Sequence, residues 1–533
     1  MLTMIVTIVV PGFVAQASAA SFTPASGTYT ADTTALTLTG PGTNISGVDQ
    51  GGIAVFSFDS VSIPFGVTIE VEGSRPFEMR SAGAFLLAGL IEGSGFDAET
   101  GVAGPVPGGP GGGAGGADGT QGGFGPGGGG HGAEEVDGGG GGGFGGTGAT
   151  GGSESGTGGA GGSAYGNLQA LLQGGSGGGG GSLGGTVGGG GGGGGVQLTA
   201  TTLTVAATGE VWAAGGNGNG GGNGASGGGS GGGILLHADT IDANGILNAD
   251  GGEGGTGGCC GDGGGGGGGR IAYEFKSLVN AGNASVAGGT SGTSGPYGFG
   301  ELSPQVAGAP GVITKAQAAT ATTGAASSIT ANLAKLSGSV NPNGHAATYR
   351  FEYGTSTSYG TSTPVPNGAV GSDAAAHELV AQLVGLKPKT TYHYRIVAED
   401  ELGFVSLGAD ATFKTKAFAG VSIHGGSVPV KNGIARIRVS AVDACKGKLK
   451  LLAKTSGATA SGKRGKSIKL GAKAFSIGAG KKKTLKVHLS HRALELLANH
   501  GSLRTQAKAS VAEALGNRKT TAHRLTLKSP KKR

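Results

Sequence analysis

The chain of 533 residues is short of several residue types on which most folded domains depend. Charged residues make up 13% and aromatic residues 5%, and there is one tryptophan, Trp212. An ordinary globular chain has about 25% charged residues. These shortages exclude one large domain with a continuous side-chain core. Glycine takes their place: 126 residues are glycine, and about 80 of them lie between 101 and 270.

Cysteine is equally scarce, with Cys259, Cys260 and Cys445 only. Three cysteines cannot build a disulfide framework, and their spacing matches no zinc site. The adjacent pair Cys259-Cys260 allows a disulfide, an intermolecular bridge, or two thiols without a role. The sequence leaves the role of all three open.

Positive charge is missing from the front of the chain. Residues 1–300 hold 4 Lys and Arg against 21 Asp and Glu, and none of the 4 lies within 101–269. Residues 301–416 are balanced, and 417–533 hold 26 Lys and Arg against 3 acidic residues, a net charge of +23. This division indicates modular construction and an anionic partner for the basic end.

The first 20 residues predict an export signal. An apolar core at 5–10 is broken by Pro11-Gly12, and Ala17-Ser18-Ala19 supplies small residues for cleavage. No Lys or Arg precedes the core, which leaves the true start codon open. No later run is long and apolar enough to span a membrane, so we expect an extracellular or cell-surface protein.

Residues 21–300 contain a repeat in which two short apolar strands flank a turn glycine and end in Gly-Gly. The copies at 203–216, 240–252 and 277–289 place their turn glycines at Gly209, Gly245 and Gly282. We predict that these glycines supply the positive φ of tight corners. Such repeats bury their apolar faces by stacking, so the spacing favours a right-handed parallel β-solenoid over small β pieces on a flexible glycine linker.

The polyglycine tracts of this segment, densest in 101–270, allow two interpretations. They either pack as bundled extended helices, because glycine alone fits at a crowded axis, or stay disordered. The segment resembles the glycine-rich β-helix surface proteins of bacteria, most clearly at 269–275, Gly-Arg-Ile-Ala-Tyr-Glu-Phe.

The sequence contains no convincing catalytic, cofactor-binding or metal-binding motif. The Gly-x-Ser-x-Gly matches around Ser176 and Ser226 arise only because glycine surrounds those serines. His131, Glu134, Glu135 and Asp137 could hold a hard cation, but a solvated loop is the simpler interpretation. We therefore expect neither a cofactor nor a resident metal.

After a linker at 301–317, residues 318–416 show clear strand alternation. The run Leu386-Lys-Pro388-Lys-Thr-Thr-Tyr392 resembles the corner before strand F of fibronectin type III domains. The resemblance implies a β-sandwich in which Leu386, Pro388 and Tyr392 are structural. The strand-B tryptophan of that family is missing here, so a smaller core is expected.

Residues 418–527 also alternate as strands, with a short helix predicted at 491–499 between the N-cap Ser490 and Gly501. Their composition resembles the lysine-rich immunoglobulin-like C-terminal modules of secreted Gram-positive proteins. The strongest candidates for contact with a polymer are the run Lys481, Lys482 and Lys483 and, within the tail at 528–533, Lys531, Lys532 and Arg533.

The fold expected from the sequence is therefore all-β: a glycine-rich solenoid followed by two β-sandwiches. We predict a secreted, non-enzymatic surface or matrix protein whose basic module contacts anionic cell-wall polymers or extracellular polysaccharide. Specific nucleic-acid binding is disfavoured, because only Phe418 and Phe475 could offer stacking surfaces in that module. A carbohydrate-active enzyme is the alternative, an adhesin a third option, and the oligomeric state stays open.

Overall fold

The computed structural model describes residues 20–99, 104–117, 119–133, 136–153, 158–181, 187–220, 223–258, 260–293, 307–454, 467–512 and 518–529. The predicted signal at 1–20 and the tail residues 531–533 therefore lie almost wholly outside the described residues. The chain separates after Ala318 into two compact units.

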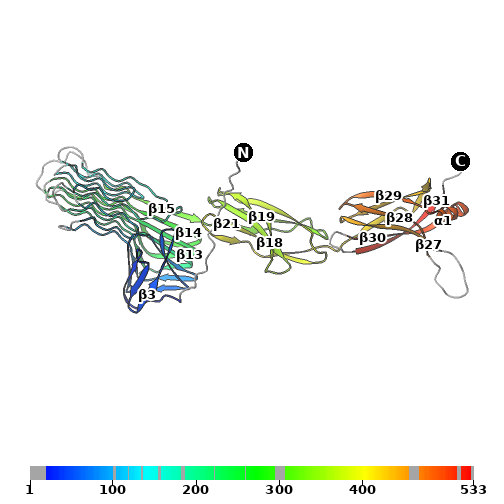
Figure 1. The fold of residues 1–533 in the computed structure, drawn as a ribbon, viewed down its shortest axis with the longest axis horizontal. Coiled ribbons are helices and arrows are strands. Elements are labelled where there is room, and N and C mark those ends of the chain that lie inside the picture. The colour runs from blue at the N-terminus through cyan, green and yellow to red at the C-terminus, as the bar shows by residue number, and fades with distance from the viewer. Residues whose placement is uncertain are drawn as a thin grey trace. The chain divides into compact units, whose positions relative to one another are not determined.

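The first unit contains one mixed sheet of 15 strands (Figure 1). Its strands are β1 (Gly27–Asp32), β2 (Thr37–Gly40), β3 (Thr43–Ser46), β4 (Val48–Gln50), β5 (Ile53–Phe58), β6 (Val61–Ile63), β7 (Val67–Glu72), β8 (Phe77–Ser81), β9 (Ala84–Leu87), β10 (Leu90–Glu92), β11 (Gly195–Val205), β12 (Glu210–Trp212), β13 (Gly233–Asn248), β14 (Arg270–Ser285) and β15 (Val312–Gln317).

The predicted repeats pair in parallel. Leu203 of β11 lies beside Ile241 of β13, which lies beside Leu278 of β14. The long strands β13 and β14 pair with each other along most of their length. Two rows of shorter parallel strands lead to β13: one has the order β5-β8-β11, and the other has the order β1-β7-β10-β12. Apolar side chains of alternate positions, such as Met79, Leu198 and Leu236, form the buried core.

A regular right-handed solenoid from residue 21 to residue 300 is not indicated, and that part of the prediction is corrected. The sheet is mixed, because β1, β2 and β3 pair antiparallel, as do β4 and β5. In addition, the described residues of 104–194, 213–232 and 249–269, where glycine is densest, form no strands. The physical reason is that a strand has two faces only because its side chains point alternately to either side. A glycine segment has no side chains, so its backbone N–H and C=O groups can form hydrogen bonds with neighbouring chains in more than two directions.

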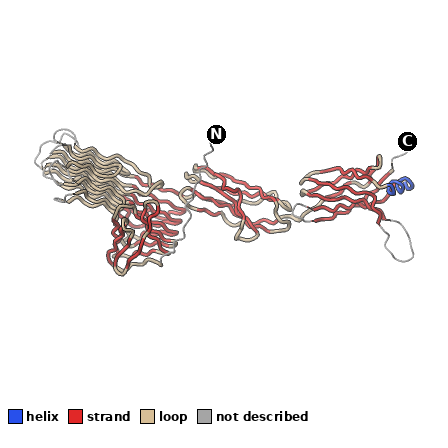
Figure 2. The backbone as a smooth tube through the Cα atoms, in the orientation of Figure 1, coloured by secondary structure: helices blue, strands red, loops and turns tan. Residues whose placement is uncertain are grey.

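The polyglycine tracts are packed, and Figure 2 shows them as extended chains running side by side. Three consecutive residues illustrate the arrangement. Gly227, Gly228 and Gly229 donate their N–H groups to carbonyls of Gly179, Gly264 and Gly216, at 2.9, 3.0 and 2.8 Å. Their own carbonyls accept from Gly190, Gly142 and Gly252, at 3.0, 2.9 and 2.8 Å. One chain therefore bonds to six others, as a helix with three residues per turn allows. We call this bundle the glycine slab.

Side chains are excluded from the slab by its own backbone. A Cβ atom on Gly227, Gly228 or Gly229 would lie closer than 3.0 Å to backbone atoms of Gly140, Gly252 or Gly191, respectively. The three directions in which a side chain could leave the helix are thus all occupied by neighbouring chains. Of the two interpretations of the tracts, the structure has the packed one.

The structure gives the repeat glycines a different role from the predicted one. Only Gly282 has a positive φ, +68°. Gly245 lies within β13, where a Cβ would collide with the Gly209 carbonyl, and a Cβ on Gly209 would collide with the Leu87 carbonyl. Stacked backbones approach so closely here that side chains do not fit. The prediction of positive φ is therefore wrong for Gly209 and Gly245.

The second unit begins with an immunoglobulin- or fibronectin-type sandwich. One sheet has the order β16-β17-β20, and the other has β19-β18-β21-β22 with β23 beside β21. The strands are β16 (Thr320–Thr323), β17 (Leu333–Asn341), β18 (Ala347–Gly354), β19 (Thr361–Gly371), β20 (His377–Val384), β21 (Thr391–Asp400), β22 (Val405–Leu407) and β23 (Ala411–Lys414). Leu336, Phe351 and Ile396 are fully buried between the sheets.

Tyr392 occupies a corner of the kind that the motif predicts. Its hydroxyl accepts the N–H of Lys387 at 3.0 Å, and its ring stacks on Phe413 with centroids 5.5 Å apart. Leu386 is buried beside this corner, and Pro388 is half-buried.

Glu352 joins two arginines on the outer face of this sandwich. Arg395 and Arg350 donate to its two carboxylate oxygens at 2.8–2.9 and 3.1 Å. Burial alone would raise the pKa of Glu352, but these hydrogen bonds outweigh it and lower the pKa below the ordinary value of 4.5. A carboxylate with a lowered pKa stabilises the fold above its unfolded pKa, and the stabilisation is lost as the pH falls through the folded pKa.

We expect Glu352→Gln to lower the free energy of opening this sandwich by about 1–2 kcal/mol at pH 7, because the charge-assisted hydrogen bonds from both arginines weaken. The difference from wild type should shrink as the pH falls below 4.5 and through the lowered pKa of Glu352. Hydrogen exchange of the β18 and β21 amides measures both quantities. Glu378→Gln removes an exposed carboxylate of β20 and is the control; an equal loss there, or a loss that does not depend on pH, would contradict the assignment.

The basic C-terminal domain is a second sandwich. Its strands are β24 (Val421–His424), β25 (Ser427–Lys431), β26 (Ile434–Ala441), β27 (Cys445–Lys454), β28 (Ser467–Ile477), β29 (Lys482–His488), β30 (Ser502–Ala512) and β31 (Arg518–Lys528), with one helix, α1 (His491–His500). The predicted helix is confirmed: Ser490 accepts the Ala493 N–H as N-cap, and Gly501 closes the helix with φ +64°. Ile437, Leu449 and Val487 lie in the core.

Candidate functional site: two basic faces

Lysines line the outer surface of one sheet of the C-terminal domain. Alternation along β27 buries Leu449 and Leu451 and turns Lys446, Lys448 and Lys450 to solvent. The neighbouring strands add cations at exposed positions, and Lys508 lies directly opposite Lys450. We call this set the first basic face: Lys446, Lys448, Lys450, Arg504, Lys508, Arg518 and Arg524.

No acidic side chain offsets these charges within the described part of the domain. Asp443 is buried, where its carboxylate accepts the N–H groups of Ala331 and Ala419 at 3.4 and 3.1 Å. Glu495 pairs with His491 on α1 at 3.0 Å. Among described residues, no Lys or Arg after 416 forms an ion pair. Like charges placed opposite each other are destabilising, so the face is suited to an anionic ligand.

A second basic face lies on the other sheet. Arg436 and Arg438 alternate with buried residues on β26, and Lys486 of β29 lies directly opposite Arg436. Lys482 lies opposite Ser440 on the same face.

The predicted lysine run is divided by the strand. Lys482 and Lys483 are the first residues of β29, and Lys481 precedes it. All three are exposed, but Lys483 has the parity of the buried residues and bends to donate to the Ser476 carbonyl at 2.8 Å. The other candidates, Lys531, Lys532 and Arg533, lie outside the described residues.

Sequence reasoning singled out adjacent lysines and passed over the face formed by β27. The available signal was the period-2 pattern at 446–450, Lys-Gly-Lys-Leu-Lys. On a strand, that spacing places all three ammonium groups on one side, whereas three adjacent lysines are divided between two sides.

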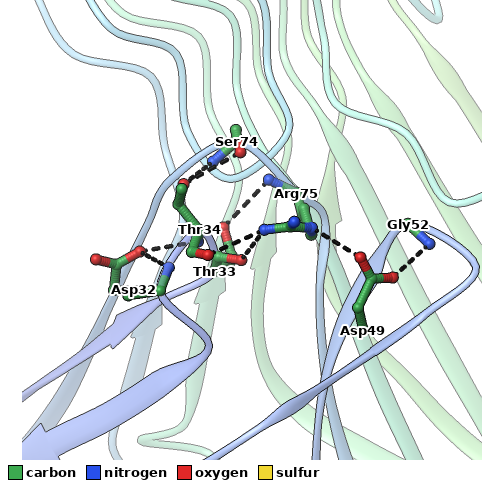
Figure 3. Close-up of polar contacts among 8 residues, drawn as sticks. Asp32, Thr33, Thr34, Asp49, Gly52, Ser74 and Arg75 are labelled. Atoms are coloured by element: carbon green, nitrogen blue, oxygen red, sulfur yellow. Dashed lines mark hydrogen bonds and ion pairs between the residues drawn. The ribbon is translucent and has the colours of Figure 1, made fainter.

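Arg75 is a structural clamp in the first unit (Figure 3). Its guanidinium donates to the Thr33 and Thr34 carbonyls, both at 3.0 Å, and to the Asp49 carboxylate at 3.1 Å. Asp49 in turn accepts the Gly52 N–H at 2.8 Å. Arg75 therefore joins its own loop to the loops at 33–34 and 49–52. Because its guanidinium N–H groups donate to protein oxygens in these loops, its role is structural.

Two buried glutamates of the first-unit sheet, Glu78 and Glu274, are too far apart to act as a catalytic pair. Glu78 accepts from Arg80 and from Thr199, the latter at 2.7 Å, and Glu274 pairs with His237 at 2.8 Å. Their strands, β8 and β14, are separated by β11 and β13. Three strand spacings of about 4.8 Å give about 14 Å, whereas glycosidase carboxyl pairs are about 5–9.5 Å apart.

A pocket of about 400 Å³ lies beside the starts of β5 and β8, and it is lined by glycines together with Ile53, Pro76, Pro126, Tyr165, Leu171, Leu172 and Gln173. The Tyr165 hydroxyl donates to the Gly174 carbonyl at 3.0 Å, and burial raises its pKa. The lining contains no charged side chain.

The remaining candidates from the sequence, the polar cluster at 131–137 and the cysteines, form no metal site in the part of the chain that the structure describes. His131 is bonded to the Gly132 carbonyl at 2.9 Å, Asp137 is buried with Ser153, and Glu134 and Glu135 lie outside the described residues. No group of three or more potential metal ligands occurs among described residues. Cys260 is disulfide-bonded, while Cys445 is a free, buried thiol whose pKa is raised by burial and by Asp443.

None of the helices in the described part of the chain has the length and apolarity that crossing a membrane requires.

No protein-family model matches the chain, and no curated protein matches it. Several solved structures match in part. A sensor domain of the anti-sigma factor RsgI4 in Pseudobacteroides cellulosolvens shows 25% identity and a TM-score of 0.16, covering 19% of this chain and 95% of that one. A tetra-tandem repeat from the extending region of a large adhesion protein shows 14% identity and a TM-score of 0.20, covering 39% and 49%. The chicken CNTN1 FN1-FN3 domains show 11% identity and a TM-score of 0.15, covering 39% and 65%.

Proposed function

We propose that this is a secreted, non-enzymatic surface or matrix protein whose C-terminal domain binds anionic polymers of the cell envelope. The observation that carries the proposal is the first basic face. It sets three lysines in line along β27 with Lys508 opposite Lys450, and no acidic side chain among described residues neutralises them. The glycine slab and the stacked strands act as a scaffold in this proposal, and the fibronectin-type sandwich acts as a spacer.

The ligand is expected to be a flexible polyanion. Lysines at alternate positions of a strand are about 7 Å apart, so they present a row of point charges that a linear chain of phosphates or carboxylates can follow. Lys ammonium groups on flexible stems suit such a chain better than they suit one shaped ligand. Attraction of this kind is screened by salt, with a Debye length of about 10 Å at 0.1 M and about 3 Å at 1 M.

The test compares the intact protein with the variant in which Lys446, Lys448 and Lys450 are all replaced by Gln, using isolated cell-wall polymer and polyphosphate as ligands. Each lost phosphate contact should lower the log–log salt slope by about 0.7–0.9, so we expect the slope to fall by about 2. Replacing Lys481–Lys483 should weaken binding less, because Lys483 already bonds to Ser476.

The control variant replaces Lys335, Lys414 and Lys416, three exposed lysines of the fibronectin-type sandwich, by Gln. It changes the net charge equally and should bind as the wild type does. Absence of binding at low salt, or binding that persists at about 1 M salt, would refute the proposed diffuse electrostatic contact.

A further inference from the structure

The first unit has an acidic counterpart to the basic faces. Parallel pairing of β7, β10, β12 and β13 sets Glu70 beside Glu92, Glu92 beside Trp212, and Trp212 beside Asn248. These positions alternate with buried residues such as Ile91 and Val211, so their side chains lie on the outer surface of the sheet. Glu210, two residues before Trp212, lies on the same surface.

The chain's one tryptophan is held against this surface. Its indole N–H donates to the Glu210 carboxylate at 2.9 Å. Both side chains leave the same face of one strand, two residues apart, so the bond requires the ring to lie along the sheet. Trp212 is half-buried in this position. A ring placed in this way offers its open face to a cation, and tryptophan is the best aromatic partner for one.

The same surface continues into the outer layer of the glycine slab. There the chains 93–98, 213–219 and 249–257 run side by side, joined by bonds such as Gly95 N–H to Ala214 at 2.8 Å and Gly218 N–H to Glu253 at 2.7 Å. Each turn of three residues directs one position outward, and those positions carry Asp97, Asp250 and Glu253. We call the whole surface the acidic face: Glu70, Glu92, Asp97, Glu210, Trp212, Asp250 and Glu253.

Within the part of the chain that the structure describes, the carboxylates of this face pair with no cation. No ion pair among described residues involves Glu70, Glu92, Glu210, Asp250 or Glu253. Glu70 and Glu92 are directly opposite each other on adjacent strands, an arrangement that costs stability unless a cation lies between them. This situation mirrors that of Lys450 and Lys508 on the first basic face.

We propose that the acidic face binds the first basic face of a second copy of this chain. Both surfaces are sheets, so both space their charges about 4.8 Å apart across strands and about 7 Å along them, and carboxylates of one can meet lysines of the other in register. A lysine of the partner covers Trp212. Because the two surfaces differ, the contact is head-to-tail, and each bound copy still offers its other surface to a further copy.

The full-length protein tests this proposal through its mass at increasing concentration, measured by light scattering and sedimentation at about 0.05 M salt, where screening is weak. We expect the mass to grow with concentration and to return to that of one copy near 1 M salt. Trp212 is the chain's single tryptophan, so its fluorescence should change with association. A chain that stays monomeric at low salt overturns the proposal.

Two variants decide whether the named surfaces meet. Glu92→Gln with Glu210→Gln removes charge from the acidic face, while the amide oxygen introduced at position 210 can still accept the indole N–H. The second variant is the triple Gln substitution of Lys446, Lys448 and Lys450. Each variant alone should associate at least about tenfold more weakly than wild type. Mixed at equal amounts, they should form dimers that do not grow, because each contributes one working surface.

The control carries Asp242→Asn and Glu378→Gln, two carboxylates outside the acidic face, and should associate as wild type does. If this control weakens association as much as the acidic-face variant, or if the mixture stays monomeric, the specific pairing is wrong. These outcomes are separate from polymer binding by the basic faces, which the acidic-face variant leaves intact.

Discussion

Gly228→Ala should destabilise the first unit by about 3 kcal/mol or more, at the upper end of the cost of overpacking a core. The added methyl group would lie closer than 3.0 Å to backbone atoms of Gly252 and Glu253. Those atoms cannot give way singly, since Gly252 donates to Gly229 at 2.8 Å and Gly228 itself donates to Gly264 at 3.0 Å. Relief of the clash therefore breaks hydrogen bonds in several chains at once.

Denaturant unfolding followed by Trp212 fluorescence measures this effect, because the single tryptophan reports on the first unit alone. Thr290→Ala is the matched control: it also lies in the slab, but at an exposed position, and it should change stability by less than about 0.5 kcal/mol. Equal effects of the two substitutions would mean that the slab tolerates side chains in its interior.

Phe144→Ala should cost the first unit about 3–5 kcal/mol, the usual range for truncating a buried phenylalanine. Phe144 is fully buried at the end of an interior slab chain, where it packs with Leu168, Leu172, Leu235 and Ala272. Its ring also meets Tyr165 edge-on at 4.9 Å and lies under the Arg270 guanidinium at 5.6 Å. The cluster joins the slab to the outer surface of β13 and β14, so its loss should loosen both.

The same fluorescence assay measures this loss, and Phe65→Ala is the control. Phe65 is 76% exposed, so its truncation should be nearly neutral. If Phe144→Ala proved equally neutral, the slab would be held to the sheet by its backbone hydrogen bonds alone.

The strands could be predicted wherever side chains alternate. Leu203, Ile241 and Leu278 marked the repeats, and Arg436 and Ile437 marked the outer and inner positions of β26, because one apolar face per strand leaves a period of two. The helix after Ser490 was equally clear, since a cap and a closing glycine are local signals.

The glycine slab could not be derived in the same way. A segment such as 188–195 contains glycine alone, so it has no pattern to show which neighbours it will have or how many. The role of Gly245 was misjudged for a related reason: a glycine required by a neighbouring backbone and a glycine required by its own φ look alike in a sequence. The acidic face was missed because its residues come from two parts of the chain, 70–97 and 210–253, that are more than 100 positions apart.

The six-neighbour bonding of the slab has a mechanical consequence. Its hydrogen bonds run across the chains, so a force that pulls along one chain loads many of these bonds in shear at the same time, instead of opening them one after another. The chains also have few side-chain rotamers to adjust and no Lys or Arg within 101–269 at which a trypsin-like protease could cut. A layer built in this way transmits tension with little stretch, a property that suits the extracellular role proposed above.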